Sequence, residues 1–467
     1  MSVPFMTQNA ADWTGGSLLQ GHLETHFTGA SIDTRSVRAG DLFVAIVGPS
    51  HDAHRFLQAA IAGGAAGLVI ERERALPAEI KPDVPVIAVD DTTRALGALA
   101  AGHRAGFRGP VVGITGSNGK TTTKEMCAAI LSVDAPCLKN EGNLNNQFGL
   151  PLTLLRRDER DRRIVVEIGM NHRGEVAALA AIARPTVGVL TNVGTAHIEY
   201  LGSQDEIARE KGDLLASLPA DGTAVVNADD PRAAAQAERS DARVVRFGRG
   251  PDADVRAEHV SEHDGRGFAL ELHTPQGRTS VEVAGVGETT IQNALAAAAA
   301  ALAAGAALDQ VAAGLAAHRP VRGRMERRDL PGDIVVLDDT YNANPQSMEM
   351  ALQSLAGAKG DHRGFAVVGD MGELGEASAE AHARVGQRAA ALGLDGLFAL
   401  GEHAEGVAAA ALDAGMPPEC VHVGSDHAGL AAQLRSILRR GDWILVKGSR
   451  AMRMERVVEE LAREGAR

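Results

Sequence analysis

Hydrophobic residues in this chain gather in short unbroken runs that alternate with longer segments of mixed polarity. A strand buried on both faces of a parallel sheet has this unbroken pattern, and the mixed segments are long enough for covering helices. The pattern therefore predicts an α/β fold. The expected strands span residues 41–46, 67–70, 84–89, 111–115, 164–168, 187–191, 223–227, 334–337, 365–368, 397–400, 421–423 and 443–446.

Two interruptions of this alternation predict domain boundaries. The first is the linker Gly106–Pro110, and the second is the Arg319-Pro320 step with the polar run that follows it. Between 243 and 285 the runs weaken, which we interpret as antiparallel β structure, and residues 289–317 form an alanine-rich helical region. A chain of 467 residues is too long for a single hydrophobic core. We expect a small α/β domain, a central P-loop domain with a parallel sheet, and a Rossmann-like domain, at residues 1–108, 109–320 and 321–467.

A glycine-containing turn follows the expected strand 111–115 and is the most informative segment. From Thr115 to Thr122 it reads Thr-Gly-Ser-Asn-Gly-Lys-Thr-Thr, and a helix is predicted to begin near Thr121. Glycines let backbone N–H groups approach a phosphate, and a helix N-terminus adds partial positive charge. Lys120 would reach the outer phosphates of a nucleotide, and the Thr121 hydroxyl would bind Mg²⁺. The common pattern G-x-x-x-x-G-K-[ST] requires glycine where this chain has Ile114, so the loop is a spacing variant.

Composition narrows the class of protein. The formal net charge of −13 argues against nucleic-acid and membrane-surface binding, although local donors can still hold small anions. The three cysteines show no metal-binding spacing, which is typical of reduced thiols in a cytoplasmic protein. The sequence shows neither a signal-peptide pattern nor an apolar run long enough to span a bilayer. We therefore expect a cytoplasmic protein without stable membrane insertion.

Polar residues near the carboxyl ends of the expected strands are candidates for chemistry, because ligands bind at that edge of a parallel sheet. Glu167 lies inside an apolar run, where an unpaired carboxylate is costly, so Mg²⁺ is the expected partner and backbone hydrogen bonding is the alternative. His197 follows strand 187–191, and the sequence leaves open whether it is a site residue or a surface residue. The pair Asp338-Asp339 ends a later strand, where it would bind ribose hydroxyls; the alternative is a turn and helix N-cap, because Asn344-Pro345 just after it is a good helix start.

Two groups of basic residues could contact anions. In the first domain, arginines and hydroxyls gather around Ser31, Thr34 and Arg35, which fits a diphosphate or a uracil edge and fits a capped surface turn equally well. At the second boundary one arginine would stabilise a transferring phosphate from across a cleft, and the others would lie at the surface. The candidates at that boundary are Arg322, Arg324, Arg327 and Arg328.

The run Thr115–Thr122 resembles the ATP loop of the Mur ligase family, which also explains its spacing. Glu167, His197 and Lys211 lie in matching local contexts, and the resemblance covers essentially the whole chain in three domains. Four segments favour the member of the family that adds D-alanyl-D-alanine: Gly142–Gly149, Asp339–Pro345, Gly369–Gly375 and Val446–Arg450. The Asp-Asn-Pro-Arg motif of the relative that adds the third amino acid is absent from the sequence.

The resemblance implies a role for each matched residue. ATP would contact Gly116, Ser117, Asn118, Gly119, Lys120, Thr121, Thr122, Asn293, Arg324, Asp339 and Asn342. Mg²⁺ would be held by Thr121, Glu167, His197 and a carbamylated Lys211, and the catalytic residues would be Lys120, Lys211, Glu167 and His197. The substrates would contact Ser31, Thr34, Arg35, Asn143, Asn145 and Asn146. Read without the family, Lys211 is a solvated helix lysine. The chain departs from the family at the adenine contacts, because Thr289 and Thr290 replace a His-Asn pair.

The implied activity is ATP-dependent amide formation in the synthesis of the peptidoglycan precursor for the cell wall. A UDP-binding first domain would present UDP-N-acetylmuramoyl-tripeptide, and an acyl phosphate would then react with D-alanyl-D-alanine. The implied cofactor is Mg²⁺, the implied partners are these small molecules, and we expect a monomer. Two alternatives remain. One is a related ligase such as folylpolyglutamate synthase, and the other is a P-loop NTPase switch, whose ATP hydrolysis would not respond to an acceptor amine.

Overall fold

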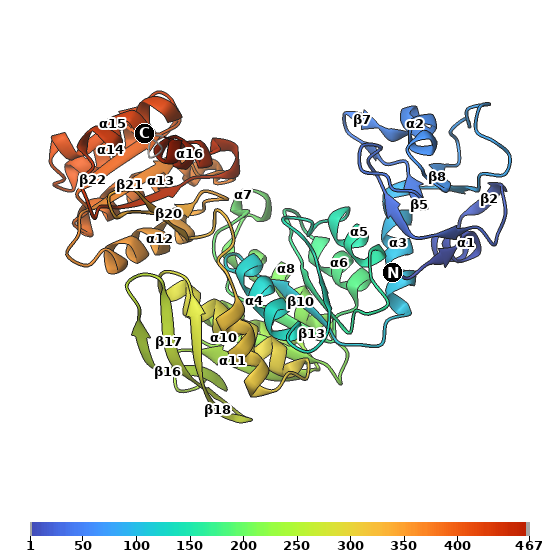
Figure 1. Cartoon of the computed structure of the whole chain (residues 1–467), viewed down its shortest axis with the longest axis horizontal. Coiled ribbons are helices and arrows are strands. Elements are labelled where there is room, and N and C mark those ends of the chain that lie inside the picture. The colour runs from blue at the N-terminus through green and yellow to red at the C-terminus, as the bar shows by residue number, and fades with distance from the viewer. Residues whose placement is uncertain (1, 464–467) are drawn as a thin grey trace.

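The structure is a computed structural model that describes residues 2–463. Figure 1 shows three bodies in an arc, with the N-terminal and C-terminal bodies at opposite ends and the central one between them. The predicted boundary at 108/109 falls between α3 (Thr92–Ala105) and β10 (Val111–Thr115). The boundary at 320/321 falls between α11 (Leu308–Ala317) and β19 (Glu326–Leu330). The division into three domains stays a prediction, and its outer ends, residues 1 and 464–467, lie outside the described range.

The N-terminal sheet has the strand order β2-β9-β8-β5-β4. Its strands are β2 (Ser17–Gln20), β9 (Val86–Val89), β8 (Gly67–Glu71), β5 (Asp41–Val44) and β4 (Gly29–Ser31). Helix α1 (Thr7–Thr14) packs against α3, whereas α2 (Leu57–Ala62) belongs to a separate hydrophobic cluster. The strands from β4 to β9 are parallel, and β2 is antiparallel. The apolar pattern predicted the inner strands and missed the two edge strands, which are short. Helix α3 also packs against α5 (Gly149–Leu155) and α6 (Glu175–Ala183), so it connects this sheet to the central body.

The central sheet runs β11-β12-β10-β13-β14-β15-β16-β17-β18. The strands that accompany β10 are β11 (Cys137–Lys139), β12 (Arg163–Glu167), β13 (Val187–Leu190), β14 (Thr223–Asn227), β15 (Arg243–Gly248), β16 (Val255–Glu262), β17 (Gly267–Thr274) and β18 (Gly277–Ala284). In the parallel register, Ile114 of β10 lies opposite both Glu167 of β12 and Val189 of β13. The carboxyl ends of these three strands therefore meet at one edge, where the chemistry was expected.

The prediction of antiparallel structure from residue 243 was wrong for its first strand. β15 pairs in parallel with β14 and with β16, and only β16, β17 and β18 are antiparallel neighbours. After β14 the chain crosses over through α9 (Pro231–Ala235) and returns to the edge of the sheet where the parallel strands begin. β15 therefore runs in the same direction as β14. A weak apolar pattern does not distinguish this arrangement from a hairpin.

Helix α10 (Glu288–Ala303) packs between α4 (Lys120–Leu131) and strands β13 to β16. Its side chains from 294 to 302 are buried, and seven of these nine residues are alanine. Small side chains let the helix lie close to its neighbours on several sides. The N-terminal end of α10 thereby brings Asn293 against the glycine-containing turn.

The C-terminal sheet has the order β19-β20-β24-β21-β22-β23, with β19 antiparallel and the other strands parallel. The strands beyond β19 are β20 (Ile334–Asp339), β24 (Trp443–Lys447), β21 (Gly364–Gly369), β22 (Gly396–Leu400) and β23 (Val421–Gly424). The main helices are α12 (Pro345–Ala358), α13 (Ser378–Ala391), α14 (Ala404–Asp413), α15 (His427–Ile437) and α16 (Glu455–Arg463). In Figure 1, α12 lies on the side nearer the central body. Within residues 2–463 no helix is long and apolar enough to cross a membrane.

Candidate functional site

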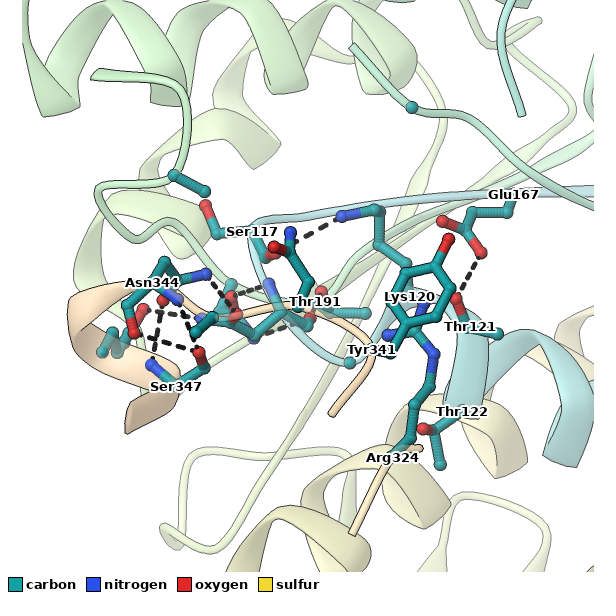
Figure 2. Close-up of a pocket in the computed structure, with 18 of the residues that line it drawn as sticks. Ser117, Lys120, Thr121, Thr122, Glu167, Thr191, Arg324, Tyr341, Asn344 and Ser347 are labelled. Carbon is teal, nitrogen blue, oxygen red and sulfur yellow. Dashed lines mark hydrogen bonds between the residues drawn. The ribbon is translucent and has the colours of Figure 1, made fainter. Parts of the chain in front are cut away.

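A cavity of about 1200 Å³ lies between the central and C-terminal bodies (Figure 2). Most of the predicted site residues line it, namely Ser117, Asn118, Gly119, Lys120, Thr121, Thr122, Asn143, Asn145, Asn146, Glu167, His197, Asn293, Arg324, Asp339 and Asn342. Gly116 and Lys211 are not part of the lining, and neither is the N-terminal group Ser31, Thr34 and Arg35. The volume exceeds the ~300–1,000 Å³ of ordinary small-molecule sites, which suits a site that gathers more than one substrate.

The phosphate loop, residues 115–122, has a backbone that requires two of its glycines. Gly116 has φ +148° and Gly119 has φ +81°, both in the region that glycine alone adopts freely. A Cβ at Gly116 would lie 1.9 Å from Thr191 Oγ1, and one at Gly119 would lie 2.2 Å from Asn293 Oδ1. The predicted helix α4 begins at Lys120, so its first N–H groups, which have no partner within the helix, lie at this turn.

Two cations approach the loop from different bodies of the protein. The Lys120 ammonium donates hydrogen bonds to two backbone carbonyls of the loop at 2.9 and 3.3 Å. Burial lowers the pKa of Lys120, the Glu167 carboxylate opposes that effect, and the Arg324 charge adds to it. The Arg324 guanidinium lies 4.0 Å from the centre of the Tyr341 ring. Figure 2 shows these two side chains next to each other. The other boundary arginines form ion pairs elsewhere: Arg322 with Glu459, Arg327 with Asp329, and Arg328 with Glu326.

Glu167 is only 2% exposed, and both of its carboxylate oxygens bind side chains. Thr121 Oγ1 donates to one oxygen at 2.7 Å (Figure 2). Asn145 Nδ2 donates to the other oxygen at 2.7 Å. The carboxylate is therefore not held by backbone N–H groups. A hydroxyl and a carboxylate in contact are the oxygen donors that Mg²⁺ prefers. Within residues 2–463 no group of three or more His, Cys, Asp or Glu residues could hold a metal ion, so these oxygens would form only part of a ligand set.

Asn140 was not predicted as a site residue, yet it positions Glu167. It is fully buried, its Oδ1 accepts from the Glu167 N–H at 2.9 Å, and its Nδ2 donates to the Leu144 carbonyl at 2.9 Å and the Glu167 carbonyl at 3.3 Å. Its own carbonyl accepts from the buried ammonium of Lys124 at 2.5 Å. The amide-rich segment after it was visible in the sequence, but the short strand β11 that places Asn140 beside β12 was not.

His197 reaches the cavity, but one of its ring nitrogens is turned toward the C-terminal body. Its Nδ1 lies 2.6 Å from Glu373 Oε2. This proximity lowers the pKa of the Glu373 carboxyl. Both residues have positive φ, +67° and +61°, which is uncommon outside glycine. No local sequence signal links two residues so far apart in the chain, so Glu373 was missed.

Lys211 lies in α8 (Gln204–Ala216) and is only 1% exposed, so its interpretation as a solvated helix lysine was wrong. Among the described residues its ammonium has no hydrogen bond or ion pair. Burial lowers the pKa of Lys211 well below its ordinary value, and the neighbouring Lys120 charge acts in the same direction. The adjacent Glu210 does not pair with it, because its oxygens accept the N–H groups of Gly174 and Val176 at 2.9 and 3.0 Å.

Asp339 lies at the cavity with both oxygens engaged. Lys447 Nζ donates to one at 2.5 Å and a backbone N–H donates to the other at 3.1 Å. The same ammonium donates to the Asn342 carbonyl at 2.9 Å, so Lys447, which was not predicted as a site residue, fixes this loop. Its neighbour Asp338 is buried and pairs with Arg328 at 2.9 Å, which is a structural contact.

The group around Ser31 forms a compact turn. Ser31 Oγ donates to the Asp33 carbonyl at 3.0 Å, and the exposed Arg35 guanidinium lies 2.6 Å from the Asp33 carboxylate. That geometry fits the alternative of a capped surface turn, and the assignment of Ser31, Thr34 and Arg35 to UDP stays a prediction.

Three family models match the chain in succession. They are the Mur ligase family catalytic domain at residues 26–104, the Mur ligase middle domain at 114–301, and the Mur ligase glutamate ligase domain at 323–450. The UDP-N-acetylmuramoyl-tripeptide–D-alanyl-D-alanine ligase of Escherichia coli (strain K12) is 39% identical over 93% of each chain.

Solved structures agree with these matches. A crystal structure of MurF from Acinetobacter baumannii superposes with a TM-score of 0.89 at 33% identity, covering 99% of this chain and all of that one. MurF from Thermotoga maritima in complex with ADP gives 0.82 at 30% identity, covering 94% and 97%. A Mycobacterium tuberculosis folylpolyglutamate synthase, also with ADP, gives 0.65 at 20% identity, covering 79% and 93%, and shares the fold alone. With relatives this similar along nearly its whole length, the chain belongs to the Mur ligase family.

Proposed function

We propose that this chain is an ATP-dependent ligase that joins D-alanyl-D-alanine to UDP-N-acetylmuramoyl-tripeptide. The observation that carries the proposal is the cavity between two bodies, in which a phosphate loop, a buried carboxylate and C-terminal cations face one another. The identity to ligases of this specificity extends over the whole of that architecture. The related folylpolyglutamate synthase is a more distant alternative.

In the first step a terminal carboxylate oxygen of the tripeptide attacks the γ-phosphorus of ATP. The bond between the γ-phosphorus and the oxygen that bridges it to the β-phosphorus breaks. The products are an acyl phosphate and ADP. This step accumulates negative charge, and phosphoryl transfer depends mainly on positioning and on neutralising that charge. Lys120, held over the loop by two carbonyls, and Arg324, held against Tyr341, supply the positive charge from the central and the C-terminal body respectively.

In the second step the amine of D-alanyl-D-alanine attacks the acyl carbon. The carbon–oxygen bond to phosphate breaks, phosphate leaves, and the amine gives up a proton. An acyl phosphate reacts with water as well as with amines, so its surroundings must exclude water. The placement of the cavity between two bodies lets the C-terminal body cover the reacting carbon.

Thr121 and Glu167 would hold Mg²⁺, which when bound supplies further neutralisation of the phosphate charge. We include Lys211 in the site as a carbamate, formed when its neutral amine adds to carbon dioxide and releases a proton. Burial and the lowered pKa of Lys211 favour the neutral amine that this addition needs. A carbamate would turn this buried amine into an oxygen donor near Glu167.

The decisive test measures phosphate release from ATP and Mg²⁺ with UDP-muramyl tripeptide, in the presence and absence of D-alanyl-D-alanine. We expect release that depends on the dipeptide and matches the amide formed. Release that ignores the dipeptide would favour a P-loop NTPase switch. Activity with a folate and glutamate in place of these substrates would favour the folylpolyglutamate alternative.

A further inference from the structure

Asn118 belongs to the phosphate loop, but its side-chain amide faces the C-terminal body. Asn344 Nδ2 donates to Asn118 Oδ1 at 2.8 Å, and Asn118 Nδ2 donates to Gln346 Oε1 at 3.2 Å. The donor and the acceptor of one amide are thus both satisfied by partners more than 200 residues away in the chain. We call these two hydrogen bonds the amide contact.

Asn118 and Asn344 are each held in place by further hydrogen bonds, whereas Gln346 is exposed. On the loop side the Asn118 N–H donates to Asn192 Oδ1 at 2.9 Å, and the Asn118 carbonyl accepts from Thr191 Oγ1 at 2.7 Å and from Asn192 Nδ2 at 3.0 Å. On the other side Asn344 is 8% exposed and caps α12, because its Oδ1 accepts the Ser347 N–H at 2.9 Å. A shift of α12 relative to the loop therefore breaks the hydrogen bond between Asn118 and Asn344.

Gly194, which follows β13, lies next to the amide contact and has no side chain that would obstruct it. A Cβ on Gly194 would lie only 2.2 Å from Gln346 Oε1, so the glutamine lies directly against backbone. The Gly194 N–H donates to Ser117 Oγ at 2.7 Å, which holds this backbone to the phosphate loop. The Gln346 amide thus lies beside two segments of the central body, Asn118 and Gly194.

We propose that Asn118 is a positioning residue that keeps the C-terminal body in register with the phosphate loop through Asn344 and Gln346. This inference rests on the proposed function, because the register matters while an acyl phosphate is present. When the contact is broken, the cavity opens more often and water attacks the acyl carbon. That side reaction regenerates the carboxylate and releases phosphate without forming an amide.

The test compares Asn118→Ala, Gln346→Ala and the double variant in the full chain, with ATP, Mg²⁺ and both substrates. Phosphate and amide product are measured in the same reaction. The matched control is Gln353→Ala, which changes the same residue type on the same helix but removes only an exposed bond to Glu349 at 2.7 Å. Asn344 is left intact because it also caps α12.

We expect the phosphate released in excess of amide to rise roughly fivefold in Gln346→Ala, the effect of losing one typical hydrogen bond, and by more in Asn118→Ala, which loses both hydrogen bonds. The double variant is expected to match the larger single effect, since both changes break one contact. Gln353→Ala is expected to keep the wild-type ratio. Wild-type ratios in both single variants, or independent effects that multiply in the double variant, would overturn the proposal.

A second measurement does not depend on turnover. Without substrates, hydrogen exchange of the backbone amides in residues 115–122 is expected to accelerate in both single variants and not in Gln353→Ala. Equal exchange in all variants would overturn the proposal. If the wild type forms no amide at all, the proposed function fails, and this exchange measurement still decides the role of Asn118.

Discussion

Replacing Asn140 by Ala removes the amide that holds Glu167 in place. The buried side chain accepts from the Glu167 N–H at 2.9 Å and donates to the Leu144 carbonyl at 2.9 Å. An unpaired buried N–H costs about 2 kcal/mol and a lost neutral hydrogen bond about 1 kcal/mol. We therefore expect a local destabilisation of about 3 kcal/mol at the end of β12. Thr121 and Asn145 are hydrogen-bonded to the Glu167 carboxylate, so a displaced Glu167 disturbs the site, and we expect the ligation rate to fall as well.

Hydrogen exchange of the Glu167 amide is the direct assay, because about 3 kcal/mol corresponds to roughly a hundredfold faster local opening. The control is Thr153→Val, which removes the single bond of a buried hydroxyl to the Gly149 carbonyl at 2.9 Å. That variant is expected to leave exchange at Glu167 and the ligation rate unchanged. Exchange in Asn140→Ala within about threefold of the wild type would refute the reasoning, since the amide would then have found another partner.

Three further outcomes are expected. Gly119→Ala places a Cβ 2.2 Å from Asn293 Oδ1 at a φ of +81°, so calorimetry is expected to show ADP binding weakened by about tenfold or more, and wild-type affinity would contradict this. Burial lowers the pKa of His318 from 6.5 to about 4, so as the pH drops the unfolded chain takes up the proton before the folded chain does. The free energy of unfolding is therefore expected to fall by up to about 3 kcal/mol as pH drops from 6.5 towards 4. Denaturant titrations of His318→Gln are expected to lose that part of the pH dependence; an unchanged slope argues against it. Lys211→Ala is expected to lose ligation, measured as amide product, and to recover part of it with short carboxylic acids, whereas failure of every acid counts against a carbamate.

The apolar runs predicted the inner strands of the N-terminal and C-terminal sheets and the strands β12, β10, β13 and β14 of the central sheet, because a strand buried on both faces has little freedom to include polar residues. The inner strands β15, β16 and β17 were indicated only as weak β structure. Edge strands such as β2 and β11 escaped, since two to four residues beside solvent leave no such pattern. The phosphate loop was readable because its chemistry is local to a few residues. The burial of Lys211 could not be predicted from the sequence, because which face of α8 is buried depends on the neighbouring elements that pack against the helix.

Residues that act across the cavity were the hardest to predict. Glu373 meets His197, and Gln346 meets Asn118, only after two separately folded bodies come together. The two residues of each pair are far apart in the chain, so the spacing of residues in the sequence does not predict that they meet. The segments that contain Glu373 and Gln346 were nevertheless visible as motifs or next to one, so the sequence located these regions without assigning the contacts.

The alanine-rich helix α10 has a consequence for mutational tolerance. Alanine has no rotamers to lose on folding, so this helix becomes ordered against the sheet at little side-chain entropic cost. Each alanine from 296 to 301 is at most 1% exposed, so any larger residue there must displace α4 or a strand. Such a displacement would move Asn293 away from Gly119. The geometry of the phosphate loop therefore depends on alanines 296–301, although these residues do not line the cavity. A saturation mutagenesis scan is expected to show that larger residues are not tolerated at these consecutive positions.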